Sequence, residues 1–221
     1  MTGAGLPFTQ EAFLEIFADY NSLLWPAQFA GYGFGLAALF ALWSRDLRFQ
    51  RIACGSLAAM WLWTGLVYHL IFFVRINPAA WLFGLVFLIE GAMLVAAARR
   101  PEALRLHRRD DLRGWIGAGL IVYALVIYPV AAVLTGHLWP RMPTFGITPC
   151  PVTLFTIGLF LFGRVPLSLW IIPLLWSLVS GAAATILEMR EDWVLLLSGP
   201  LALLALAISS RRCDPDASGR A

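Results

Sequence analysis

Seven apolar segments alternate with short polar connections along this chain of 221 residues. Runs of about 20 apolar residues match the hydrocarbon core of a lipid bilayer. Hydrophobic residues make up 60% of the chain and charged residues 13%, whereas soluble domains are roughly half apolar and a quarter charged. We therefore predict an all-α membrane protein with about seven transmembrane helices between residues 25 and 209. The segments cover residues 25–43, 52–74, 79–98, 115–135, 147–163, 166–187 and 192–209.

Arginines in the connections predict which way the bundle faces. The first connection contains Arg45, Arg48 and Arg51, and the third holds six arginines between residues 99 and 113. The second, fourth and sixth connections carry one arginine each. Because arginine-rich connections remain in the cytoplasm, we expect the N-terminus outside and the C-terminus inside. Residues 210–221 are then a cytoplasmic tail, which we expect to be disordered.

Residues 1–24 precede the first apolar segment and predict an amphipathic helix on the membrane surface. Apolar side chains from Phe13 to Tyr20 fall on one helical face, and carboxylates recur every four residues on another. The acidic stripe fits a solvated face, and attraction of cations is the alternative. The carboxylates are Glu11, Glu15 and Asp19.

The fifth segment is the shortest and could be re-entrant. Its part from Pro151 to Gly163 spans only about 20 Å at 1.5 Å per residue, against a hydrocarbon core of about 30 Å. A re-entrant segment would place Arg211 and Arg212 outside, which the arginine rule disfavours. We therefore expect a full crossing that starts near Phe145, with prolines in its first turn.

Glu90 is the carboxylate that lies deepest inside an apolar segment, and an ionisable side chain at such a depth predicts a functional site. Tyr123 in the next segment lies at a similar depth and is the expected hydrogen-bond partner. The pair could relay protons or cations during transport. Alternatively, Glu90 is an uncharged carboxyl that clamps two helices together.

Cys150, His137 and His69 are expected at the outer end of the bundle. One cysteine and two histidines would suit a soft or borderline transition metal ion, so we consider a metal site. They come from different segments, and the alternative is three buried side chains with structural roles. The chain has no lysine, so it cannot hold retinal through a Schiff base. The arginines flank membrane segments, so we expect no nucleic-acid binding.

Two strings carry a resemblance to known families. With YHLIFFVRINPAAWLFG and GHLWPRMPTFGITPCPVTLFTIGLFLFG, the chain resembles a family of bacterial integral membrane proteins of unknown function along nearly its whole length. That resemblance implies a multi-pass protein of the bacterial inner (plasma) membrane. Gly146, Pro149, Cys150 and Pro151 are also similar to a Gly-x-x-Pro-Cys-Pro string of nickel/cobalt exporters, which implies a metal ion as cargo. The exporters' histidine-rich loop has no counterpart here.

These observations predict a transporter or channel for a small ion or solute, with a metal ion as the leading candidate. The alternative is a receptor or an accessory subunit, and partners beyond the bilayer would then include further copies or a larger complex. A membrane enzyme is the weakest hypothesis, because thiol redox chemistry normally needs a second cysteine beside Cys150.

Overall fold

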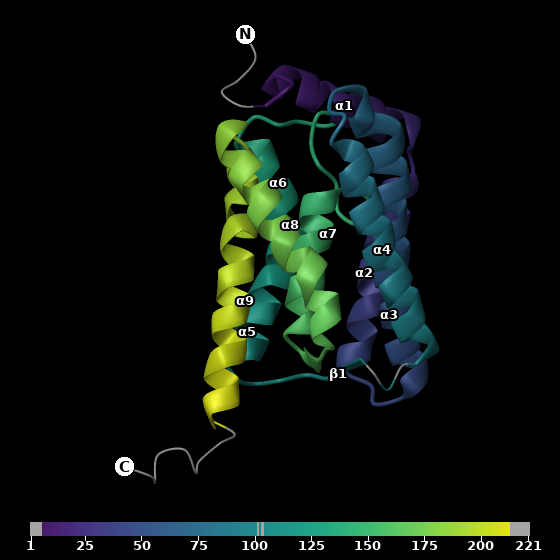
Figure 1. Ribbon diagram of the computed structural model, residues 1–221, viewed down its shortest axis with the longest axis vertical. Helices are drawn as coiled ribbons and strands as arrows, with labels where there is room; N and C mark the ends of the chain where they lie inside the picture. Colours follow the sequence, from purple (N-terminus) through teal and green to yellow (C-terminus); the bar gives the residue numbers. More distant parts are fainter. Residues whose placement is uncertain (1–5, 101, 103, 213–221) are drawn as a thin grey trace.

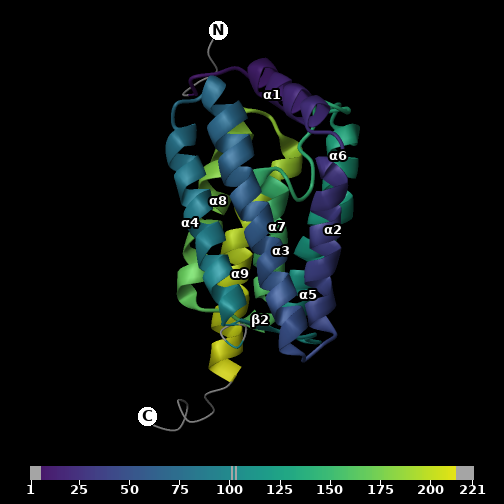
Figure 2. The same cartoon turned by 90° about the vertical axis from the view of Figure 1, so that its right-hand side faces the viewer.

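A computed structural model describes residues 6–100, 102 and 104–212, with side chains to residue 209. Long helices stand side by side, and α1 lies across one end of the bundle (Figures 1 and 2). The opposite end carries the two short strands. The elements are α1 (Gln10–Leu23), α2 (Ala27–Leu39), η1 (Phe40–Leu42), α3 (Leu47–Trp63), η2 (Thr64–Phe72), η3 (Phe73–Arg75), α4 (Ala80–Arg99), β1 (Arg105–Leu106), α5 (Leu112–Val122), η4 (Tyr123–Ile127), α6 (Tyr128–Leu134), α7 (Pro149–Phe160), β2 (Gly163–Arg164), α8 (Leu167–Ile186), η5 (Arg190–Asp192) and α9 (Trp193–Arg212).

Within the described part of the chain, five helical stretches are long and apolar enough to cross a membrane. Many of their large apolar side chains point away from the bundle; Leu85 is 54% exposed and Trp115 is 72% exposed. Such an outer surface suits lipid, because soluble proteins rarely expose continuous apolar patches of this kind. The five stretches are Leu47–Arg75, Ala80–Arg99, Leu112–Leu134, Leu167–Ile186 and Arg190–Ser209.

The first predicted segment is shorter than expected. It consists of α2 and η1 and ends at Leu42, and α1 adjoins it at an angle of 88°. α1 begins where Thr9 caps it by accepting a hydrogen bond from the Ala12 N–H at 3.2 Å. Its apolar face is buried against the end of the bundle, with Phe17 and Tyr20 almost fully covered. The predicted amphipathic helix therefore forms, and its apolar face covers protein.

The loop over residues 136–148 holds α1 on the bundle. The Tyr20 hydroxyl donates to the Ile147 carbonyl at 2.6 Å, and the Asn21 amide donates to the carbonyls of Pro140 and Met142 at 2.7 Å. These bonds satisfy loop carbonyls that would otherwise be buried without partners. Arg141 adds exposed ion pairs to Glu11 and Glu15 of α1.

α7 is the centre of the bundle, and all twelve of its residues are buried. It packs against α3, α5, α8 and α9 (Figure 2). The predicted helix over 147–163 is thus too long: the helix begins at Pro149 and ends at Phe160. A helix surrounded by protein need not match the bilayer thickness, because its neighbours and not lipid cover its ends.

A two-stranded antiparallel sheet, which the sequence does not reveal, joins the connections at the other end. Arg105 pairs with Arg164, and Leu106 with Gly163. The buried Gln50 side chain fastens this sheet to α3: its amide donates to the Leu106 carbonyl at 3.0 Å, and its oxygen accepts from the Leu106 N–H at 2.8 Å.

Candidate functional site

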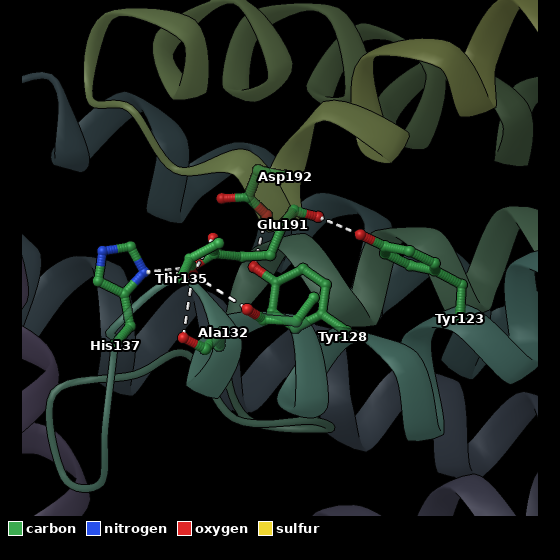
Figure 3. A network of polar contacts seen from close by, with 8 residues as sticks. Tyr123, Tyr128, Ala132, Thr135, His137, Glu191 and Asp192 are labelled. Carbon is green, nitrogen blue, oxygen red and sulfur yellow. Dashed lines mark hydrogen bonds and ion pairs between the residues drawn. The ribbon is translucent and has the colours of Figure 1, made fainter.

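A buried carboxyl pair lies in η5, the turn between α8 and α9. Glu191 and Asp192 are 1% and 3% exposed. Burying carboxylates is costly unless donors surround them, so their partners define the site. Figure 3 shows those partners arriving mainly from η4, α6 and the residues that follow α6.

Glu191 points away from the bundle axis, towards the loop after α6. One carboxylate oxygen lies 2.7 Å from His137 Nδ1, and the other accepts from the Thr135 hydroxyl at 3.2 Å (Figure 3). The Tyr123 hydroxyl donates to the Glu191 backbone carbonyl at 2.8 Å. With a protonated imidazole, the contact with His137 is a buried ion pair.

Asp192 has uncharged partners. The buried Tyr128 hydroxyl donates to Asp192 Oδ1 at 2.5 Å, and the Cys150 thiol lies beside the same carboxyl group. Cys150 Sγ also lies 3.3 Å from Ser180 Oγ on α8. Asp192 therefore receives a hydrogen bond and no compensating positive charge from its described partners.

Asp192, Cys150 and Ser180 line a cavity of about 300 Å³ beneath α1. This volume is at the lower end of the range for small-molecule sites. Aromatic rings from α1, η2, η3, α4 and α8 form part of the wall. They include Phe13, Phe17, Tyr68, Phe73, Phe83 and Trp176.

His69 lines the same cavity and is completely buried. Neither of its ring nitrogens has a hydrogen-bond partner among the described residues, and the same holds for Nε1 of Trp176 in the cavity wall. The large majority of buried side-chain polar atoms have a hydrogen-bond partner, so these groups are an unusual feature of the cavity wall. His69 and Tyr68 belong to η2, a π-helical stretch, and π-helical turns often occur at functional sites.

Glu90 and Tyr123 do not form the predicted pair. Glu90 is fully buried in α4, and both of its oxygens lack hydrogen-bond partners within the described part of the chain. Tyr123 instead bonds the Glu191 carbonyl. The predicted hydrogen bond is absent because a similar position along two helices does not specify which faces of the helices meet. The hydrogen-bonded helix clamp is not formed either.

The three predicted metal ligands come near the outer site with separate partners. His137 contacts Glu191, Cys150 contacts Asp192, and His69 lies in the cavity wall beside Phe87, with ring centroids 4.7 Å apart. Within the described ranges, no group of three or more His, Cys, Asp or Glu side chains could hold a metal ion.

The residues missed from the sequence are Glu191, Asp192, Tyr128, Thr135 and Ser180. A signal for the carboxyl pair was available: two adjacent acids directly precede the last apolar segment. No local signal pointed to Tyr128 or Ser180, because a hydroxyl within an apolar helix is informative only once its neighbours are known.

A family model for a family of unknown function matches residues 10–215 of the chain. The chain belongs to the family of unknown function DUF6064. This confirms the resemblance to a family without an assigned function, and the match includes α1 and the whole carboxyl site. Neither a curated protein nor a solved structure matches the chain. The similarity to nickel/cobalt exporters remains a similarity of one short string.

Proposed function

We propose that this DUF6064 protein is a membrane transporter for a small solute that enters the cavity at the α1 end of the bundle. The observation that carries the proposal is the order of three side chains along one face of α4, of which Phe83 is half-buried and Phe87 and Glu90 are buried. Phe83 lines the cavity, Phe87 follows one turn later, and Glu90 follows Phe87 by three residues. Residues spaced by three or four lie on the same helical face.

Phe87, the second of these three residues, forms an aromatic barrier between the cavity and Glu90. Phe87 packs on Trp61 with ring centroids 4.4 Å apart and on Trp176 at 4.8 Å. Trp61 is held by its hydrogen bond to Thr156 of the central helix at 2.9 Å. A solute beyond this barrier would reach a carboxyl group about 10 Å further along α4 than Phe83.

Glu90 lies near the middle of α4, about 15 Å from each end. An ionisable group half-way across an apolar bundle is costly and is usually retained for transport or proton movement. Its unpartnered oxygens favour the relay over the clamp. We therefore assign Glu90 the role of the inner polar point of the route, with the cavity as the outer one.

The proposed arrangement has seven crossings, an external N-terminus and a cytoplasmic C-terminus in a bacterial inner membrane. α2, α7 and the five long stretches would supply the crossings, with α7 sheltered from lipid. Supporting this, the α1 end carries few arginines and the β1–β2 end carries many. A small organic solute suits the aromatic cavity better than the metal ion expected from the sequence.

Transport can be tested with purified protein in liposomes on a solid-supported membrane. The panel should contain solutes of each charge class, including small amines, carboxylates and neutral alcohols. We expect at least one class to evoke a charge-translocation current, and Glu90→Gln to lower that current about tenfold or more, since it removes the ionisable group. Asp19→Asn is the matched control, because Asp19 is exposed on α1.

The opposing result is a folded protein that gives no current with any class of solute. In that case the proposed transport is wrong, and a receptor or accessory subunit becomes the better description. A current of wild-type size in Glu90→Gln would remove Glu90 from the route.

A further inference from the structure

The cavity wall contains a single formally charged side chain, Asp192, in the part of the chain that is described. No arginine among the described residues lines the cavity, and the described partners of Asp192 are a hydroxyl and a thiol. A carboxyl group buried without a positive partner ionises only at a cost, and a cation bound beside it would supply the missing positive charge. An anion in the same place would be repelled.

Aromatic rings cover much of the remaining wall. Tyr68 and Phe73 stack with ring centroids 5.7 Å apart, and Phe83 packs edge-on against Trp176 at 5.2 Å. The faces of such rings carry negative charge density and attract ammonium groups. A cavity lined by several aromatic rings and one carboxyl group is therefore suited to an organic cation and not to a strongly hydrated inorganic ion.

The N-terminus of α7 also opens on the cavity, through Thr148, Pro149 and Cys150. Helix N-termini normally favour anions through their free N–H groups. Here the first and third helical residues are Pro149 and Pro151, which have no N–H. Cys150 supplies the one N–H among these three residues, so this helix start offers little to an anion.

The distribution of charge at the α1 end of the bundle also favours a cation over an anion. Six carboxyl residues lie there among the described residues, against three arginines, Arg75, Arg141 and Arg190. Glu188 lies in the wall of a shallow pocket that shares Leu6 and Leu187 with the main cavity. An acidic approach raises the local concentration of cations.

We infer that the cavity binds a small organic cation, an ammonium group on a compact apolar body. The ammonium would lie against Asp192 and the aromatic faces. This inference rests on the proposed function in taking the cavity as the solute site.

Three probes of nearly equal shape separate charge from size: choline, its uncharged carbon isostere 3,3-dimethylbutanol, and the anion 3,3-dimethylbutanoate. We expect choline to bind the purified full chain about tenfold or more tightly than the alcohol, as ion pairing and cation–π attraction predict. The anion should not bind. Isothermal titration calorimetry in detergent provides the three dissociation constants.

Asp192→Asn should weaken choline binding about tenfold or more and change binding of the alcohol less than about twofold. Asparagine has nearly the same size as aspartate and still accepts a hydrogen bond from Tyr128, so the fold is retained. Asp19→Asn serves as the control for loss of a carboxylate at the same end. In wild-type protein, choline should also slow alkylation of Cys150 by N-ethylmaleimide more than the alcohol does at equal concentration.

Equal binding of choline and the alcohol, or an unchanged choline affinity in Asp192→Asn, would overturn the inference. So would a folded protein that binds none of the three probes. These measurements need no transport. Binding of choline without any transport current would leave the cation site standing and reject the transporter. A current evoked by anions alone would support the transporter and reject the cation site.

Discussion

Adjacent residues in this protein can have opposite roles, as Glu191 and Asp192 show. The Glu191 side chain is bound by His137 and Thr135, and Asp192 faces the cavity with uncharged partners. Breaking a buried pair by removing one partner typically costs 3–5 kcal/mol. We therefore assign Glu191 the structural role of holding η5 in place, and Asp192 the role of meeting the ligand.

A carboxylate at the other end of the bundle should set part of the pH dependence of stability. Asp111 caps α5 by accepting a hydrogen bond from the Gly114 N–H at 3.1 Å, and the bond from Arg109 lowers the pKa of Asp111 to about 2. Asp111→Ala should lower the free energy of unfolding by about 1 kcal/mol at neutral pH. The control Asp110→Ala should cost less than about 0.5 kcal/mol, since Asp110 is exposed.

The pH profile separates this capping role from general damage. A folded-state pKa below the unfolded value of about 3.9 stabilises the protein above that value. The contribution is lost as the pH falls towards 2. Thermal unfolding in detergent should therefore show a gap between wild type and Asp111→Ala that is constant from pH 7 to 5 and closes near pH 2. A gap that persists at pH 2 would contradict the assignment.

At the scale of the elements, a close backbone contact between the 136–148 loop and α2 determines how the loop enters the bundle. Gly146, at φ +80°, packs directly on Gly31 of α2. A left-handed backbone conformation favours glycine, and the contact leaves no room for a Cβ on either residue. The loop can therefore descend between helices before α7 begins, which is why the central helix is short.

Two glycines of α2 provide a matched test of this contact. A Cβ on Gly31 would lie 2.5 Å from the Phe145 carbonyl oxygen, whereas a Cβ on Gly33 would meet nothing within 4 Å. Gly31→Ala should destabilise the protein by about 1–3 kcal/mol through overpacking. Gly33→Ala should be neutral or stabilise by up to about 1 kcal/mol, because alanine favours a helix. Thermal unfolding midpoints of both variants decide the matter, and equal effects would contradict the packing.

At the scale of the whole molecule, charge is segregated between the two ends. The end with α1 and the cavity carries more carboxylates than arginines, and the end with β1 and β2 carries more arginines than carboxylates. In a membrane this asymmetry orients the bundle. We therefore propose that the solute site faces the outside and that the sheet held by Gln50 faces the cytoplasm.

Cysteine labelling in intact cells tests that orientation. In a Cys213→Ser background, Leu138→Cys should react with a membrane-impermeant maleimide, because Leu138 is 59% exposed at the α1 end. Arg105→Cys, in the exposed part of β1, should react only after the cells are opened. Strong labelling at position 105 in intact cells would invert the proposed topology.

The sequence by itself determined the helical class, the positions of the long apolar helices and the amphipathic helix before them. It also predicted that Glu90 is buried. These properties depend on local composition and on the spacing of apolar residues, which any apolar helix must satisfy wherever it packs. The match to a family of unknown function was likewise visible in two strings of the chain.

Only the tertiary structure decided which side chains meet. Glu90 and Tyr123 lie at similar depths along their helices, yet Tyr123 bonds Glu191, 68 positions further along the chain. Asp192 becomes a cavity residue because α8 turns sharply into α9 beside α6 and α7. In a bundle that is apolar throughout, hydrophobicity marks no preferred face on each helix. The neighbours of a polar residue are then set by glycine contacts, prolines and turns, which act only when the whole chain is packed.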